Sequence, residues 1–387
     1  MFSRIVTDNL LKAVEQMPAV SLTGVRQCGK TTILKELFPS HVYLSLENPN
    51  TLKIVKDDPI SYFADLNTKW IIDEAQNYPE LFSYLQGFID ENPIKGRFIL
   101  SGSQNFLLSD NISQSLAGRI AVLELLPLTH NEFITHDAVG KYDIWEYLYN
   151  GSYPRPYNEN IDIKTWYASY IKTYIERDVR ALVNIDKLDK FQLFLSLLAA
   201  RNGQLLNLSS IAGDCGVSKT TIDYWLKILE ESYLVFLLRP YYKNFKKRLV
   251  KTPKVYFYDT SIVCQLLSIE SPEHLKIHSA RGAIFEGFVV SELLKVLKYK
   301  SYRPSIFFFR DYAGQEVDII IETPNENIAI EVKSSSTYDS SFLDVLNKWS
   351  KLDEGNKIKK LVYSGQENRK IKDVQLISWD KVVDALK

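Results

Sequence analysis

The chain has few cysteines and histidines, no excess of either charge, and no long apolar run. Its three cysteines, Cys28, Cys215 and Cys264, lie far apart and form no C-x-x-C pair. This excludes a disulfide scaffold and a redox motif, and it indicates a reducing compartment. No stretch approaches the ~18 apolar residues that a membrane span needs. We therefore expect a cytoplasmic protein that does not enter a membrane.

The five histidines show no H-E-x-x-H or similar spacing, so none is predicted to bind zinc. Lysines and arginines number 47, and so do aspartates and glutamates. Because the overall charge provides no attraction, nucleic-acid binding would depend on a local basic patch. The 45% of apolar and 24% of charged residues are typical of a folded globular protein, and 387 residues predict more than one domain.

Residues 1–135 alternate β-branched runs with helical stretches, a pattern typical of a parallel sheet covered by helices. The expected strands are Ala19–Thr23, Val42–Leu46, Trp70–Asp73, Phe98–Ser101 and Ile120–Leu125. Over residues 136–200 we expect a helical segment, because aromatic residues recur there at helical spacing. Its Trp166, Tyr170 and Tyr174 repeat every four residues, which favours a core face over a ligand site.

Residues 201–280 predict a winged-helix-like domain. A helix, a turn at Gly216 and a second helix capped by Ser218 form a helix-turn-helix candidate, and the runs VFLLRPY and KVYFYD would supply the hairpin. Residues 281–387 predict a second α/β domain, which begins with the helix FEGFVVSELLKVL. Its further expected elements are strands Ile306–Arg310, Glu316–Ile321, Asn327–Val332, Lys360–Tyr363 and Val374–Ser378, with a helix near Phe342–Leu352.

A phosphate-binding loop is predicted at residues 24–31, which read G-x-x-x-x-G-K-T between the strand AVSLT and the helix TTILKELF. The two glycines permit backbone shapes that direct amides at phosphate oxygens, and the lysine neutralises the β- and γ-phosphates. The threonine is expected to ligate Mg²⁺. The residues expected to contact ATP here are Gly24, Val25, Arg26, Gln27, Cys28, Gly29, Lys30, Thr31 and Thr32.

Two carboxylates end the apolar strand at Trp70–Asp73. Asp73 is expected to hold Mg²⁺, and Glu74 to orient or deprotonate the attacking water, which predicts hydrolysis of ATP. The next strand ends at Ser101, with Ser103 shortly after it. Either hydroxyl could sense the γ-phosphate at the carboxyl end of a parallel sheet, or both could cap the intervening turn.

The segments GVRQCGKT, WIIDEAQ and FILSGSQ resemble the AAA+ branch of the phosphate-loop ATPases. Over nearly the full length, SQSLAGRIAVLELLPLTHNEF, GSYPRP, YIKTYIERDV, KTPKVYFYDT and IFEGFVVSEL resemble one bacterial and archaeal family of ATP-binding proteins. The resemblance implies an ATPase core, a helical and winged-helix-like middle, and a C-terminal domain related to the PD-(D/E)xK nucleases. It implies no known biological role.

AAA+ ATPases often complete their site with an arginine from a neighbouring subunit, so the resemblance includes a homo-oligomer among the expected states. The candidates are Arg119, Arg177 and Arg180. Arg119 precedes a strand and is preferred for the nucleotide. Arg177 and Arg180 lie on one expected helix, where both could instead pair with neighbouring carboxylates, and a solvated structural role stays open for all three.

The C-terminal domain carries the pattern Asp-x(12)-Glu-x-Lys, formed by Asp318, Glu331 and Lys333. Glu331 and Lys333 alternate onto one strand face, so the carboxylates could bind Mg²⁺ or Mn²⁺ while the ammonium steadies a hydroxide or a phosphate. Glu286, on the preceding helix, matches the position of an extra helical carboxylate in PD-(D/E)xK enzymes. Val317 stands where those enzymes have proline. The alternative is a fold that keeps these charges without turnover.

A basic run over residues 239–254 predicts a contact with DNA. Its seven basic residues have no acidic neighbour in the run and are interleaved with aromatic ones: Arg239, Tyr241, Tyr242, Lys243, Phe245, Lys246, Lys247, Arg248, Lys251 and Lys254. The helix that starts at Ser218 could enter a major groove through Lys219, Thr220 and Tyr224. A solvated face or a protein contact is the alternative.

These patterns predict an ATP-hydrolysing AAA+ protein that acts at DNA, with a metal-dependent nuclease as one reading of its C-terminal domain. The alternative is an ATP-driven switch or interaction protein whose nuclease-like domain is inactive.

Overall fold

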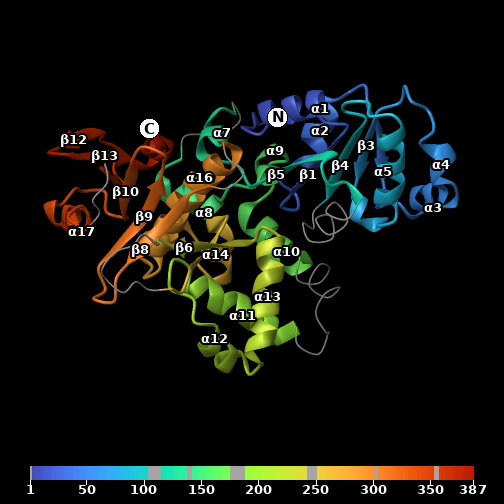
Figure 1. The fold of residues 1–387 in the computed structure, drawn as a ribbon. Coiled ribbons are helices and arrows are strands. Elements are labelled where there is room, and N and C mark those ends of the chain that lie inside the picture. The colour runs from blue at the N-terminus through green and yellow to red at the C-terminus, as the bar shows by residue number, and fades with distance from the viewer. Residues whose placement is uncertain are drawn as a thin grey trace. The chain divides into compact units, whose positions relative to one another are not determined.

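The computed structural model describes residues 2–102, 115–136, 142–174, 188–241, 251–300, 304–352 and 357–387 (Figure 1). It divides into two compact units, which are described separately. The first comprises Met1–Leu128 with the short segments Tyr153–Arg155 and Glu231–Tyr233. The second comprises the remaining ranges Thr129–Ser152, Pro156–Glu230 and Leu234–Lys387. Among the residues that the structure describes, no helix is both long and apolar enough to cross a membrane.

The first unit is built on a five-stranded, fully parallel sheet in the order β2-β3-β4-β1-β5. The strands are β1 (Ala19–Gly24), β2 (Val42–Ser45), β3 (Trp70–Asp73), β4 (Phe98–Gly102) and β5 (Ile120–Leu125). All the predicted strands are confirmed, and so is the α/β class of this region. Strands β1, β3 and β4 are buried along their whole length, as expected for the centre of a parallel sheet. Their carboxyl ends lie at one edge.

Helices cover this sheet: α1 (Thr7–Gln16), α2 (Lys30–Leu37), α3 (Pro49–Asp57), α4 (Pro59–Tyr62), η1 (Ala75–Asn77) and α5 (Leu81–Glu91). Asn48 starts α3 by accepting two main-chain hydrogen bonds just before a proline, which is a favourable helix start. The core between sheet and helices is aromatic. The Phe63 ring meets those of Trp70 and Phe98 edge to face, with centroids 5.1 and 6.2 Å apart.

Helix α7 (His130–Ile134) precedes the expected helical segment, which contains α8 (Ile144–Asn150), α9 (Pro154–Asn158), α10 (Ile163–Tyr174) and α11 (Leu188–Ala200). Trp166 and Tyr170 are buried and stacked, with centroids 5.1 Å apart. This confirms the interpretation of Trp166 and Tyr170 as part of a core face. The side chain of Tyr174 lies outside the described part.

The helix-turn-helix candidate consists of α12 (Leu208–Cys215) and α13 (Lys219–Glu231). Gly216 ends α12 in the left-handed conformation, with φ 60°, and the Ser218 hydroxyl accepts the Thr221 N–H at 3.1 Å. Strands β6 (Val235–Pro240) and β7 (Lys254–Phe257) then pair in antiparallel fashion, as expected of the hairpin. Strand β6 also pairs with β8, so the hairpin extends the C-terminal sheet.

That sheet has eight strands in the order β12-β13-β11-β10-β9-β8-β6-β7. Its remaining strands are β8 (Ile306–Arg310), β9 (Glu316–Glu322), β10 (Asn327–Lys333), β11 (Lys357–Tyr363), β12 (Arg369–Ile371) and β13 (Val374–Ser378). The accompanying helices are α14 (Thr260–Leu266), α15 (Pro272–Ile277), α16 (Arg281–Lys300), η4 (Ser340–Leu343), α17 (Asp344–Trp349) and η5 (Trp379–Leu386). All the expected strands are present. The expected helix at Phe342–Leu352 is shorter, because η4 occupies its start.

A buried carboxylate organises the helical part of the second unit. Asp259 accepts hydrogen bonds from the Ser152 N–H at 2.6 Å, the Ser152 hydroxyl at 2.8 Å and the Tyr167 hydroxyl at 3.1 Å. It also caps α14. At Gly151 a Cβ atom would lie 2.1 Å from the Tyr167 hydroxyl, so only glycine fits. The segments GSYPRP and KVYFYDT therefore meet in a structural junction.

Candidate nucleotide site and carboxylate cluster

The predicted phosphate loop joins β1 to α2 at the carboxyl edge of the first sheet. Its backbone is left-handed at Gln27 and Gly29, with φ 62° and 95°. At Gly24, where φ is 144°, a Cβ atom would lie 2.0 Å from the carbonyl oxygen of Leu125 on β5. Gly24 is thus required for the close approach of the loop to β5, whereas Gly29 is required for its backbone conformation.

Lys30 lies over this loop. Its Nζ donates to the carbonyl oxygens of Gly24 and Val25, each at 2.9 Å, and the residue is 7% exposed. The ammonium is therefore held at the centre of the turn that would receive phosphates. Val25 and Cys28 are buried, and their N–H groups donate to the carbonyl oxygens of Leu125 and Val25, whereas Thr32 is exposed at the start of α2.

Asp73, the last residue of β3, brings three hydroxyl groups together. Its Oδ2 accepts the Thr31 hydroxyl at 2.9 Å and the Tyr43 hydroxyl at 2.7 Å, and its Oδ1 accepts the Ser101 hydroxyl at 2.5 Å. The structure thus joins three residues that sequence reasoning selected. Tyr43 was missed, because nothing in the sequence distinguishes it from a core tyrosine. Burial, reinforced by Asp73, raises the pKa of Tyr43.

Glu74 follows directly, and its backbone is left-handed, with φ 55°. The Gln76 amide donates to its Oε2. Glu74 is half-buried, and Gln76 lies in the short helix η1. Gln76 therefore holds the Glu74 carboxylate just beyond the end of β3.

Arg4 holds the phosphate loop in place through two hydrogen bonds to main-chain carbonyl oxygens. Its Nη1 donates to the carbonyl oxygen of Cys28 at 2.8 Å, and its Nη2 to that of Leu126 at 2.5 Å. The Cys28 thiol contacts the Leu125 carbonyl oxygen at 3.2 Å. The buried guanidinium thereby ties the loop to the end of β5. Sequence reasoning gave no indication of this role, because the partners of Arg4 are main-chain atoms distant along the chain.

Arg119 lies at the amino end of β5, whereas the phosphate loop lies at the carboxyl end of β1, which runs parallel to it. Its guanidinium binds both carboxylate oxygens of Asp90, at 2.5 and 2.9 Å. The structure therefore does not bring Arg119 to the loop of its own chain, and its selection as a nucleotide contact stays a prediction. The other candidates, Ser103, Arg177 and Arg180, lie outside the described residues.

The predicted C-terminal residues do converge. Asp318 on β9, Glu331 on β10 and Glu286 on α16 interact electrostatically. Burial and the neighbouring carboxylates raise the pKa of Asp318, and burial raises that of Glu331. Lys333 binds the Glu331 Oε1 at 2.5 Å, and the Val332 N–H donates to the Asp318 Oδ2 at 2.8 Å.

This cluster also contains Lys254 and Glu316, which sequence reasoning did not assign to it. Lys254, on β7, lies 2.9 Å from the Glu286 Oε1 and also forms an ion pair with Glu316. Within the described ranges, no group of three or more His, Cys, Asp or Glu side chains is arranged to hold a metal ion. Of the carboxylates expected to bind a metal, Glu286 pairs with Lys254 and Glu331 with Lys333, whereas Asp318 accepts the Val332 N–H.

For the residues predicted to contact DNA, the structure shows only which side chains are exposed. Lys219, Thr220 and Tyr224 are exposed on α13, as are Arg239 and Lys251 in the basic run. The prediction was wrong for two members of the run, because Tyr241 and Lys254 are each 2% exposed. Tyr241 packs in the core of the C-terminal sheet, and its hydroxyl accepts the Asn327 amide at 3.0 Å. Residues 242–250 lie outside the described part.

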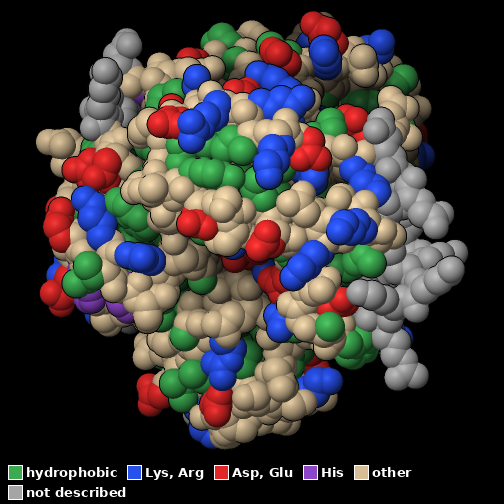
Figure 2. All heavy atoms as spheres, turned by 90° about the vertical axis from the view of Figure 1, so that its left-hand side faces the viewer, with side chains coloured by type: hydrophobic (Ala, Val, Ile, Leu, Met, Phe, Trp, Pro, Cys, Tyr) green, Lys and Arg blue, Asp and Glu red, His purple; other side chains and the backbone are tan. Residues whose placement is uncertain are grey.

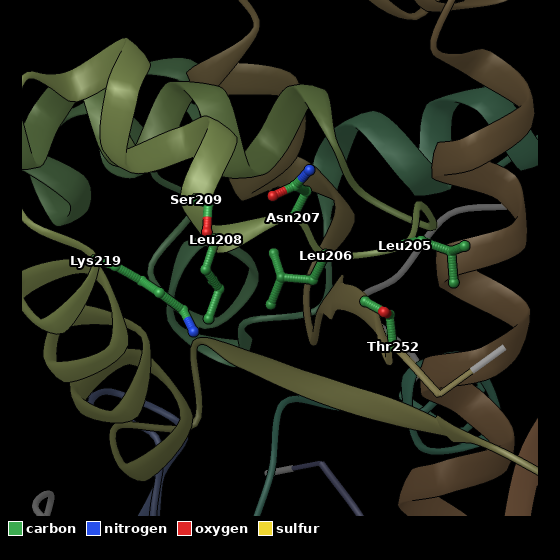
Figure 3. A pocket seen from close by; sticks show the side chains of 7 residues that line it. All are labelled: Leu205, Leu206, Asn207, Leu208, Ser209, Lys219 and Thr252. Carbon is green, nitrogen blue, oxygen red and sulfur yellow. The ribbon is translucent and has the colours of Figure 1, made fainter.

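Lys219 also lines a pocket of about 510 Å³ at the start of the helix-turn-helix candidate (Figure 3). The other lining residues are Leu205, Leu206, Asn207, Leu208, Ser209 and Thr252. Figure 3 shows the lysine reaching from α13 toward Leu208. Elsewhere, on the face drawn in Figure 2, basic and acidic side chains are interspersed, as the balanced charge predicts.

Comparison with known proteins assigns the chain to a family. The uncharacterized proteins Rv2008c of Mycobacterium tuberculosis and Mb2031c of Mycobacterium bovis are each 30% identical to it over 337 residues, which cover 86% of this chain and 74% of each relative. The chain belongs to their family. A further relative, the uncharacterized protein MJ1544 of Methanocaldococcus jannaschii, is 23% identical over 419 residues, which cover 96% of this chain and 91% of the relative.

Three family models match successive parts of this family member. Residues 16–134 match a model described as AAA domain, which makes this part an AAA-type ATPase domain of the phosphate-loop class. Residues 141–273 match a domain of unknown function, DUF8612, and residues 281–382 match another, DUF4143.

Solved structures that resemble the chain include the Walker-type ATPase PABY2304 of Pyrococcus abyssi, at 16% identity and a TM-score of 0.45, with 69% of this chain and 96% of that chain covered. The RuvB Holliday junction branch migration motor of Thermotoga maritima has 19% identity and a TM-score of 0.33, with 62% and 90% covered.

Proposed function

We propose that this protein binds ATP together with Mg²⁺ at residues 24–31 and hydrolyses it. The observation that carries the proposal is the position of Asp73, whose carboxylate joins the hydroxyls of Thr31 and Ser101 beside a loop covered by Lys30. Oxygen donors of this kind are those that Mg²⁺ prefers, so the residues present fit the ion. When bound, Mg²⁺ would neutralise charge on the β- and γ-phosphates.

In ATP binding and hydrolysis, the residues of this chain would have the following roles. Main-chain amides of the loop and the start of α2 would bind the phosphates, and Lys30 would exchange its two carbonyl partners for phosphate oxygens. Thr31 and Asp73 would hold the metal ion. Glu74, steadied by Gln76, would orient the attacking water and accept its proton. Ser101 would keep the Asp73 carboxylate in place while facing the γ-phosphate.

Two variants test this assignment. Lys30→Ala is expected to abolish detectable ATP binding, whereas Glu74→Gln is expected to bind ATP normally and to arrest its hydrolysis. ATP binding is measured by calorimetry and turnover by phosphate release. Normal turnover in either variant would refute the proposal, and a Glu74→Gln variant that cannot bind would refute the role given to Glu74.

We further propose that the protein acts at DNA. The exposed side chains at the start of α13 support this, since a second helix of a helix-turn-helix presents such groups to a groove. Lys219→Ala should lower the affinity for duplex DNA and reduce the slope of log K against log salt concentration by about one. Lys53→Ala on α3, also exposed, is the matched control. Binding that does not respond to salt would contradict the proposal.

We also propose that the protein forms a homo-oligomer. Arg119 could contribute to a nucleotide site only if that nucleotide were bound by another copy of the chain. Light scattering after gel filtration, with and without ATP, tests it. A monomer under both conditions would refute it.

For the C-terminal domain, the ion pairs of Lys254 favour the inactive nuclease-like alternative, since the carboxylates as arranged do not form a metal shell. The active alternative predicts degradation of DNA in Mg²⁺ or Mn²⁺ that is lost in Asp318→Ala and Lys333→Ala. DNA that stays intact with either metal supports an ATP-driven switch whose C-terminal domain binds a partner.

A further inference from the structure

Gln76, the middle residue of η1, is buried, and only one end of its carboxamide has a partner. The residue is 9% exposed, and its Nε2 donates to the Glu74 Oε2. Its Oε1 is buried without a hydrogen-bond partner among the described residues. A buried polar atom that lacks a partner is costly and therefore rare in folded proteins. This oxygen thus marks a place where a hydrogen-bond donor from outside the chain would bind.

The orientation of this carboxamide is set by Glu74. If the amide were turned over, its oxygen would face a carboxylate oxygen, and two acceptors cannot share a hydrogen bond. The nitrogen of Gln76 therefore faces Glu74, and the oxygen occupies the other arm of the same amide. The Gln76 Oε1 and the Glu74 carboxylate are consequently separated by the width of one amide group. One water molecule can bridge two acceptors at that spacing.

The main chain on both sides of Gln76 is fixed. The Asn77 N–H donates to the Glu74 carbonyl oxygen at 3.0 Å, and the Asn77 side-chain amide donates to the Leu46 carbonyl oxygen at 3.2 Å. Ala75 is fully buried in the core of the first unit. Helix η1 is therefore tied to the segment that follows β2 and to the core. A side chain that orients a water molecule needs such a rigid support.

We propose that Gln76 is a catalytic residue whose Oε1 accepts a hydrogen bond from the water that attacks ATP. The inference rests on the proposed function, from which it takes the nucleotide and the role of Glu74. One hydrogen of the water would face Gln76 and the other Glu74, so that a lone pair is directed at the γ-phosphorus. The water oxygen then bonds to phosphorus, its proton passes to Glu74, and the bond to the bridging oxygen breaks with its electron pair on ADP.

An amide oxygen suits this position better than a charged acceptor. A second carboxylate there would repel both Glu74 and the phosphates, whereas the amide accepts from the water without adding negative charge. The alternative is that Gln76 only steadies Glu74. That role needs the Nε2 group alone and leaves the buried Oε1 without a partner, whereas the proposal gives both ends of the amide a partner.

The test compares two analogues of bound ATP on the full chain with Mg²⁺. ADP with beryllium fluoride mimics the substrate, and ADP with aluminium fluoride mimics the transition state with the water in line. Gln76→Met should lower kcat about 100-fold with little change in KM. It should bind the beryllium complex normally and the aluminium complex about tenfold more weakly, because one hydrogen bond is lost. Gln16→Met, exposed at the end of α1, is the matched control and should change none of these values.

The same comparison in a Glu74→Gln background separates contact with the water from an effect through Glu74. If Gln76 binds the water itself, Gln76→Met should again weaken the aluminium complex about tenfold. A loss that occurs only when Glu74 is present would show that Gln76 acts through that residue, and this result would overturn the proposal.

Turnover and folding give further outcomes. A folded Gln76→Met that hydrolyses ATP at the wild-type rate, beside a Glu74→Gln that does not, would overturn the role of Gln76 alone. Gln76→Leu provides a second variant, and if neither variant folds, Gln76 is a structural residue and the proposal fails. The proposed function fails instead, and this inference with it, if the wild type does not hydrolyse ATP or if Glu74→Gln leaves hydrolysis intact.

Discussion

The hydroxyl groups of Thr23 and Tyr233 lie 2.9 Å apart and are buried, so that they share a hydrogen bond. Thr23 immediately precedes Gly24 of the phosphate loop. Tyr233 lies two residues beyond the end of α13, and Glu231–Tyr233 belongs to the first compact unit. Its backbone is left-handed, with φ 57°, a strained conformation for a bulky residue. The bond therefore ties the base of the loop to the segment that ends the helix-turn-helix candidate.

Replacing Tyr233 by Phe should lower the free energy of unfolding by about 1 kcal/mol, because one buried hydrogen bond is lost while the ring is kept. It should also raise the KM for ATP, since Thr23 anchors the loop. Urea unfolding and ATPase assays measure the two effects. Thr23→Val removes the other partner and also the hydrogen bond from the Thr23 hydroxyl to the Leu123 carbonyl oxygen, so the double variant should be no worse than Thr23→Val alone. Additive losses would show that the two hydroxyls do not act as a pair.

Gly24→Ala should abolish ATP binding, because the added Cβ would overlap the Leu125 carbonyl oxygen and the backbone at φ 144° disfavours alanine. Gly87→Ala is the matched control. Gly87 lies in α5, where a Cβ atom would meet nothing within 4 Å, so alanine there should stabilise the protein by about 0.5–1 kcal/mol. Calorimetric titration with ATP and thermal unfolding distinguish the two. Unimpaired ATP binding by Gly24→Ala would contradict the loop geometry.

Tyr43→Phe should raise the Mg²⁺ concentration needed for half-maximal ATPase activity by about tenfold, because Asp73 loses one of the hydroxyls that orient it. At saturating Mg²⁺ the turnover should change little, since Thr31 and Ser101 still hold the carboxylate. Tyr84→Phe, on the exposed side of α5, is the control. An unchanged Mg²⁺ requirement would show that Tyr43 only packs.

The sequence predicted the strands of the first sheet and the residues of the loop because both depend on local patterns. The parallel register then places Asp73 beside Ser101, since β3 and β4 pair at those positions. Arg4 and Tyr43 escaped prediction for the opposite reason. Their partners are fixed by the assembled fold, and neither lies in a motif that points to them.

Lys254 and Arg119 show where local reasoning fails. A basic run is normally solvated, but the carboxylates that bury Lys254 come from α16 and β9, far along the chain. Arg119 is close to an expected strand, yet a strand has two ends, and the sequence does not indicate which end carries the nucleotide. Burial and direction are properties of the assembled sheet, which is why the sequence could not supply either.

His130 should make the second unit sensitive to acid. Its imidazole is buried between Tyr147 and Trp379, with ring centroids 5.0 Å away in each case. Burial lowers its pKa from 6.5 to about 4, against a hydrogen bond to the Asp380 main chain that acts in the other direction. The unfolded chain binds a proton near pH 6.5 and the folded one does not. The stability that neutral His130 contributes is therefore fully present above pH 6.5 and is lost as the pH falls toward 4.

His130→Phe should remove this dependence, because phenylalanine keeps the ring contacts and cannot be protonated. Between pH 7.5 and 5, the wild type should lose about 2 kcal/mol more of its free energy of unfolding than the variant. The comparison cancels other groups, such as Glu292, whose pKa burial raises and whose contribution therefore changes in the opposite sense. Urea unfolding at both pH values provides the measurement. Equal losses in the two proteins would mean that the imidazole is protonated in the folded state, and the buried neutral ring inferred from its contacts would then be incorrect.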